Sequence, residues 1–166
     1  MADNRIRTCR FGDCKHEDRE IYLDYEPYVK AGNRFYHEDC YKKLKAKEQT
    51  SKDLQEFKQI WHDQISETVN YGYLIKILNQ YIRDGISSDY LLFCLKYVLY
   101  KGMNLNYPNG FKYYVDNGEI KEAYRKNRAK KKLKARQEAY KATVKPQEPS
   151  FWVADKPRGF QSVLNK

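Results

Sequence analysis

The chain has 166 residues and a formal net charge of +10, with 32 basic and 22 acidic side chains. Aromatic residues make up 15% of it, including 16 tyrosines, which provides enough large apolar surface for a core. No stretch approaches the roughly 18 apolar residues that cross a bilayer, and the first residues lack the apolar run of a signal peptide. We therefore expect a globular cytoplasmic protein with no membrane partner.

The first 45 residues contain two close pairs of metal-ligand residues. Cys9 and Cys14 are separated by four residues, and after a gap of 22 residues His37 and Cys40 are separated by two. Two such pairs with a long gap between them are typical of structural zinc sites, in which both pairs close on one ion. Four protein ligands leave no position open for water, so we predict structural Zn²⁺ in a module of residues 1–45.

Two alternatives concern these ligands. A disulfide is the other use of two cysteines, but cytoplasmic proteins rarely keep disulfides and a His-x2-Cys pair has no role in one. His16 is a rival to Cys14, and we favour Cys14 because it completes a thiolate-rich site with Cys9. Cys94 lies in the apolar segment 90–99, so we expect it to be a buried thiol outside the site.

The region between the ligand pairs has the pattern of short strands. Residues 21–25 alternate in polarity, and residues 28–36 predict a β-hairpin that turns at residues 31–33, Ala-Gly-Asn. A helix is expected after Cys40.

Residues 46–120 carry a net charge of −1 and are predicted to form a helical domain. Apolar periodicity indicates three helices, at residues 51–67, 71–83 and 89–100. Thr50 or Ser51 is the expected cap of the first helix, and the Ser87-Ser88 pair caps the third. Segment 111–115 suits either a short strand or the start of a helix.

The second and third of these helices have the spacing of a helix-turn-helix. However, residues 89–100 are apolar almost all round, which suits a buried central helix. A helix that reads a DNA groove exposes polar side chains instead. We therefore favour a structural role for this pair.

Residues 121–145 hold eleven basic and two acidic side chains, a net charge of +9, and contain neither Gly nor Pro. They predict a long basic helix that begins at Asp116 or Asn117. A dozen residues of helix span about 18 Å, the scale of several phosphates along a duplex. A solvated charged face is the alternative. The predicted nucleic-acid contacts, to DNA in preference to RNA, are Arg125, Lys126, Arg128, Lys130, Lys131, Lys132, Lys134 and Arg136.

Residues 146–166 are interrupted by prolines and predict an extended tail. Phe151 and Trp152 form an apolar island in it, and two large aromatic side chains are costly to leave in water. We expect them to dock on a partner or on the core of the same chain.

Catalytic patterns are lacking. The chain has three histidines, none beside a Ser or Asp arrangement typical of a triad, and no phosphate-binding glycine loop. The sequence therefore predicts a protein that is not an enzyme and has no small-molecule substrate.

Three segments carry a family resemblance: Cys9-x4-Cys14, the aromatic hairpin 28–35, and Tyr-His-Glu-Asp-Cys-Tyr at residues 36–41. Together they resemble one LIM-type, treble-clef zinc finger, although that family normally has two residues between its first two cysteines. The order of finger, helical region and basic tail is similar to small accessory proteins encoded by phages of Gram-positive bacteria. That similarity implies a factor of the host cytoplasm that acts on nucleic acid or on a host machine.

The expected fold is thus mostly α-helical, with a small β-hairpin zinc module, a helical domain, a long basic helix and an extended C-terminal tail. The expected function is that of a zinc-containing, nucleic-acid-binding accessory protein of replication, recombination or transcription. The alternative is a phage-type interaction factor that binds and modulates or inhibits a host protein machine.

Overall fold

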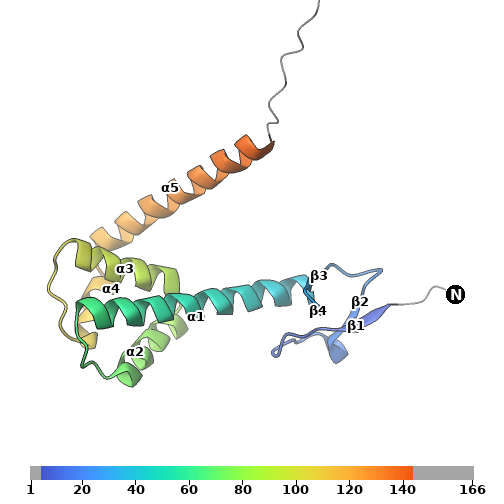
Figure 1. Ribbon diagram of the computed structural model, residues 1–166, viewed down its shortest axis with the longest axis horizontal. Helices are drawn as coiled ribbons and strands as arrows, with labels where there is room; N and C mark the ends of the chain where they lie inside the picture. The colour runs from blue at the N-terminus through green and yellow to red at the C-terminus, as the bar shows by residue number, and fades with distance from the viewer. Residues whose placement is uncertain (1–4, 144–166) are drawn as a thin grey trace, which may run out of the picture. The chain divides into compact units, whose positions relative to one another are not determined.

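The computed structural model describes residues 5–143 (Figure 1). The chain divides into a unit that ends at Arg125 and a second unit that starts at Lys126. Two small antiparallel hairpins come first and helices make up most of the rest, so the mostly helical fold class is confirmed. The predicted tail 146–166, with Phe151 and Trp152, lies outside the described residues.

The N-terminal module is built on two strand pairs. Strand β1 (Ile6–Thr8) pairs antiparallel with β2 (Glu20–Tyr22), and β3 (Tyr28–Ala31) pairs antiparallel with β4 (Arg34–His37). Gly32 has a φ of 59°, which a residue without Cβ adopts at little cost, so the predicted turn at Ala-Gly-Asn is confirmed. The buried core of this module is small: Cys9, Phe11, Ile21, Tyr36 and Cys40. So few buried side chains cannot stabilise a module of this size alone.

Helix α1 (Glu38–Gln64) runs without a break from the second ligand pair into the helical region (Figure 1). The prediction of a separate helix starting at Thr50 or Ser51 and ending at residue 67 is therefore wrong. The hydroxyl of Thr50 donates to the carbonyl of Ala46 at 3.0 Å, one turn earlier, and so does not act as a cap. Strong helix formers on both sides, with no Gly or Pro, favour continuation of the helix.

Helices α2 (Tyr71–Arg83) and α3 (Ser88–Tyr100) confirm the predicted segments 71–83 and 89–100. Asn70 caps α2 by accepting the Tyr73 amide at 3.0 Å, and Ser87 caps α3 by accepting the Tyr90 amide at 3.3 Å.

Helix α3 is the buried centre of the helical core. Leu91, Cys94, Leu95 and Val98 are all fully buried on it. Burial raises the pKa of the Cys94 thiol to about 12, because a thiolate there would lose its hydration. The prediction of a buried thiol at Cys94, on a buried helix, is confirmed.

Helix α4 (Phe111–Val115) resolves the choice between strand and helix at this segment. Phe111 and Val115, four residues apart, are both buried, as helical spacing requires. The Phe111 ring packs edge-on against Phe57 and Trp61 of α1, with centroid distances of 5.2 and 6.5 Å. This aromatic cluster joins α4 to α1 in one core with α3.

A buried polar contact also fixes α1 against α3. The carboxylate of Asp53 is 5% exposed and accepts hydrogen bonds from Ser88 Oγ at 2.6 Å and Gln49 Nε2 at 2.7 Å. These two hydrogen bonds replace the hydration that the Asp53 carboxylate loses on burial, which would otherwise be costly.

We expect Ser88→Ala to lower the free energy of unfolding by about 1–3 kcal/mol, because the buried carboxylate of Asp53 loses a donor. Chemical denaturation measures the change. Ser51→Ala, at an exposed position of α1, is the matched control and should stay within about 0.5 kcal/mol of wild type. Equal effects of the two substitutions would contradict the assigned role of the buried contact.

Helix α5 (Gly118–Thr143) carries the basic segment. Asn117, not Asp116, provides its cap, since Asn117 Oδ1 accepts the amides of Glu119 and Ile120 at 2.8 and 3.3 Å. The first turns belong to the helical core, where Ile120 is fully buried and the Tyr124 hydroxyl donates to Asp89 at 2.8 Å.

Candidate metal centre

The first ligand pair is placed by the end of β1 and the loop that follows it. The Cys9 amide donates to the Arg19 carbonyl at 2.7 Å, which holds Cys9 beside the start of β2. The Cys14 amide donates to the Phe11 carbonyl at 3.2 Å and closes a turn. This turn brings the second thiol back towards the first despite the four intervening residues.

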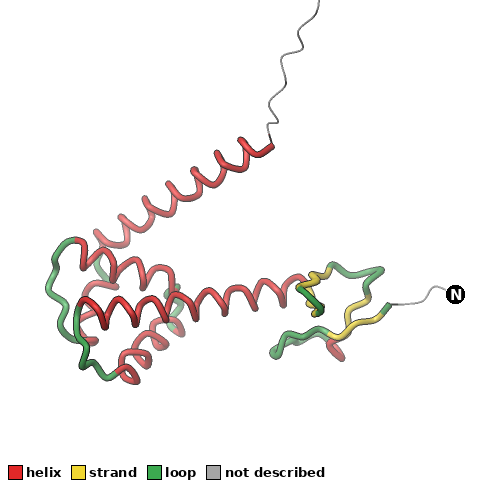
Figure 2. The backbone as a smooth tube through the Cα atoms, in the orientation of Figure 1, coloured by secondary structure: helices red, strands yellow, loops and turns green. Residues whose placement is uncertain are grey.

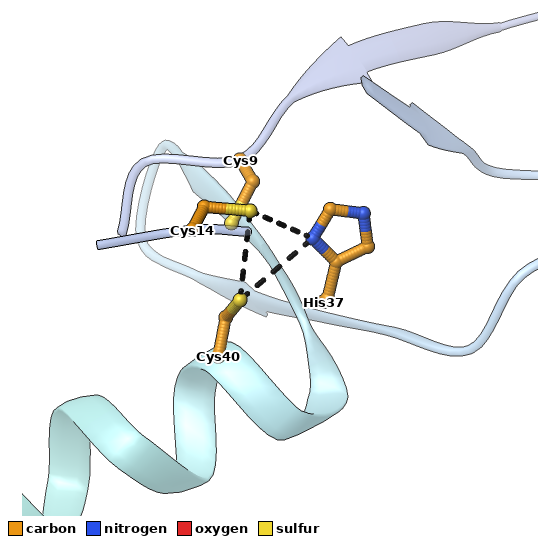
Figure 3. Close-up of side chains that lie close together, drawn as sticks. All are labelled: Cys9, Cys14, His37 and Cys40. Carbon is orange, nitrogen blue, oxygen red and sulfur yellow. Dashed lines mark hydrogen bonds between the residues drawn. The ribbon is translucent and has the colours of Figure 1, made fainter. Parts of the chain in front are cut away.

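The second ligand pair lies where β4 runs into α1. His37 is the last residue of β4 and the residue before α1, and Cys40 lies in the first turn of that helix. Residues three apart on such a turn project to one side, so both side chains face the first pair (Figure 3). Cys9, His37 and Cys40 are buried and Cys14 is partly buried.

The four ligand atoms all lie within 4.8 Å of one another. Cys14 Sγ is 3.6 Å from His37 Nδ1 and 3.7 Å from Cys40 Sγ, and Cys40 Sγ is 3.9 Å from His37 Nδ1 (Figure 3). Zinc–sulfur bonds of about 2.3 Å at tetrahedral angles place two sulfurs about 3.8 Å apart. The four residues are thus close enough to bind a metal ion, and the spacing of Cys14, His37 and Cys40 fits a tetrahedral site.

The ring of His37 is already oriented for coordination. Its Nε2 lies 2.9 Å from the Glu20 carbonyl, which can only accept, so Nε2 carries the proton. The lone pair is then on Nδ1, the nitrogen that faces the two sulfurs. A backbone carbonyl as outer partner is a common way to fix the tautomer of a metal-binding histidine.

The pKa values of Cys9 and Cys40 are shifted in opposite directions. Burial and the neighbouring thiols of Cys14 and Cys9 raise the pKa of Cys40 to about 12, because adjacent negative charges repel. Burial also opposes ionisation of Cys9, but hydrogen bonds, chiefly from the backbone of Phe11 and of His37, lower its pKa overall. A divalent cation removes the repulsion, since it binds thiolates directly.

His16 lies beside the centre. Its ring stacks on that of His37 at 3.8 Å between centroids, and its Nε2 lies 3.1 Å from Asp39 Oδ1. His16, Asp39 and Cys40 also form a close group, but this group has only three members, two of them exposed. The larger and more buried cluster includes Cys14, which favours Cys14 as the ligand.

The basic residues predicted to contact nucleic acid are all on α5, and all eight are exposed. Two contacts near the metal centre could not be found by sequence reasoning. The Glu20 carbonyl that orients His37 is a backbone group without a side-chain signal, and the proximity of Asp39 to His16 depends on the fold.

Comparison with models of known protein families, with curated proteins and with solved structures finds no match to this chain. Within residues 5–143, none of the helices combines the length and the apolar character needed to cross a bilayer.

Proposed function

We propose that this protein is a zinc-containing, nucleic-acid-binding accessory factor whose α5 helix binds the phosphate backbone. It acts in the cytoplasm. If a phage encodes the protein, this is the cytoplasm of the host cell. The proposed metal is Zn²⁺, because three thiolates and one imidazole form a soft donor set in a closed tetrahedral site. Its role is structural, within a LIM-like, treble-clef finger.

The observation that carries the proposal is the state of the basic side chains on α5. Within the part of the chain that the structure describes, no carboxylate pairs with Arg128, Lys130, Lys131, Lys132, Lys134 or Arg136. Four of the six lysines of α1 differ. Lys42, Lys43, Lys45 and Lys47 each pair with a carboxylate, so their charge is largely neutralised.

The basic side chains surround α5, and four of the eight share one face of it. Steps of three and four residues place Arg125, Arg128, Lys132 and Arg136 along one face of the helix. Neighbouring Cβ atoms on this face are about 5–6 Å apart, and like charges at this spacing destabilise the free helix. Phosphates at a comparable spacing relieve that repulsion and release their condensed counterions.

The finger has a different role in this proposal. Its residues 1–45 carry a net charge of only +1, which is too little to provide most of the electrostatic attraction to a polyanion. We infer that it provides a stable start for α1, which follows directly from the second ligand pair.

A direct test is the binding of full-length protein to a fluorescein-labelled, mixed-sequence DNA duplex, followed by anisotropy at about 50 mM salt. We expect saturable binding that a second, unrelated duplex sequence competes equally, because lysines on phosphates carry no base code. Absence of binding under these conditions, together with co-purification of one specific protein, would favour the protein-interaction alternative.

A further inference from the structure

The loop that joins α3 to α4 is drawn in green in Figure 2. Residues of this loop and of α4 line a pocket of about 720 Å³. This volume is within the range of about 300–1,000 Å³ typical of small-ligand sites. Among the described residues, those that line it include no acidic or basic side chain; the polar ones are Asn104, Asn106, Tyr107, Asn109, Tyr113, Tyr114 and Asn117. Aromatic rings and amides without charge suit a planar, uncharged group that carries donors and acceptors.

Two of the tyrosines leave their rings open to solvent. Tyr107 is 75% exposed and Tyr113 is 80% exposed. Tyr114 differs, because its hydroxyl donates to the Asn104 carbonyl at 2.6 Å and holds the loop against α4. Rings as large as those of Tyr107 and Tyr113 gain free energy when another flat surface covers them. They therefore provide two stacking surfaces at the edge of the pocket.

Two of the asparagines are held in one orientation. Asn109 Oδ1 accepts the Tyr73 hydroxyl at 2.7 Å, and Asn117 Oδ1 accepts the first amides of α5. Each oxygen is engaged, so each side chain offers its NH₂ group as a donor. By contrast, the side-chain amides of Asn104 and Asn106 have no hydrogen-bond partner within residues 5–143 and offer both a donor and an acceptor.

We propose that this pocket binds an unpaired nucleobase of a single-stranded nucleic acid, with Tyr107 and Tyr113 stacking on base faces. An asparagine amide matches a base edge that presents a donor beside an acceptor, as adenine does. In a duplex the base faces are covered by neighbouring pairs, so this site selects unpaired strands. The inference rests on the proposed function, because it assigns the phosphates of the same strand to α5.

A neutral sugar is the competing ligand, since sugars also stack on tyrosine and bond to amides. The charge of the chain favours the nucleic acid. Asn117 caps α5, and the segment of net charge +9 starts four residues later at Lys121. Phosphates complement that charge, whereas a neutral glycan does not.

The test compares single-stranded DNA with the matching duplex in binding to the full chain. We expect the double variant Tyr107→Ala/Tyr113→Ala to lose affinity for the single strand on the order of 10- to 100-fold and to keep its duplex affinity. The matched control is Tyr25→Ala/Tyr100→Ala, whose rings are 75% and 85% exposed outside the pocket, and it should change neither. Unchanged single-strand binding by the pocket variant would refute this inference and leave the proposed function standing. If the wild-type protein bound neither form, both would fail.

Adenosine, which has no phosphate, separates the pocket from the basic helix. We expect millimolar adenosine to shift the NMR signals of the Tyr107 and Tyr113 rings, and the shifts to persist at high salt. A neutral disaccharide that shifts these signals while adenosine does not would overturn the assignment to a nucleobase.

Discussion

Replacing Cys40 with serine should abolish stoichiometric metal binding and unfold the N-terminal module. Zinc binding to structural sites is worth about 10–16 kcal/mol, as much as the whole stability of a typical domain, about 5–15 kcal/mol. Within residues 5–45 the buried apolar core has five members, of which Cys9 and Cys40 are themselves ligands, so little remains when the ion is lost. We expect the amide signals of residues 5–37 to collapse in NMR spectra, with zinc content near zero by mass spectrometry.

The helical core should survive this substitution. Phe57, Trp61 and Phe111 pack around α3 without any metal ligand, and so should give an unchanged cooperative thermal transition. His16→Ala is the matched control: the ring lies next to the centre, but the variant should keep its zinc. A Cys40→Ser protein that retains zinc and a folded module would show that the four-ligand site is misassigned. Loss of zinc in His16→Ala would show that His16, in place of Cys14, is the fourth ligand.

Reversing four charges on α5 should have the second large effect. In Lys130→Glu/Lys131→Glu/Lys132→Glu/Lys134→Glu the net charge falls by eight, and the centre of the basic segment becomes acidic. Each lost phosphate contact removes a released counterion, so we expect duplex binding to fall by at least about 10³-fold at 50 mM salt. Glutamate is a good helix former, and circular dichroism should therefore remain unchanged. Anisotropy measures the loss.

The control carries the same change in net charge elsewhere. Lys15, Lys52, Lys76 and Lys112 are exposed and lie outside α5, so their replacement by glutamate repeats the global effect without altering the helix. We expect a loss of at most about tenfold, from long-range repulsion that salt screens. Equal losses in the two quadruple variants would mean that binding follows total charge, not the α5 surface.

The sequence predicted those features whose signals are local. Helix α2 has its predicted bounds and α3 starts one residue before its predicted start, because Asn70 and Ser87 cap them from the adjacent residues. The ligand cluster was also predictable, because Cys9, Cys14, His37 and Cys40 are of residue types and spacings that few other structures require.

Features were harder to predict where two local sequence signals favour different structures. Thr50 and Ser51 are good caps by type, but the flanking helix formers kept α1 continuous and the Thr50 hydroxyl bonded within the helix. The sequence does not predict the pairing of the three-residue strands β1 and β2, because eleven residues separate Thr8 from its partner Glu20.

The pocket is a further case. Residues 102–110 have the composition of a turn, and nothing in their sequence indicates that their asparagines line one pocket with Tyr113. That arrangement forms with segment 111–115 as a helix, and the sequence left the choice between strand and helix open. Sites that form when a loop packs on a helix are therefore only visible once the fold is known.

The most direct test of the central claim, that exposed charges on α5 bind phosphates, is the salt dependence of duplex affinity. If all eight basic side chains contact phosphates, a plot of log K against log salt concentration should have a slope of about −7. If only some of them do, the slope should be about −4 or steeper. Binding that stays unchanged from about 50 mM to 0.5 M salt would contradict the account, because counterion release could not then be its source.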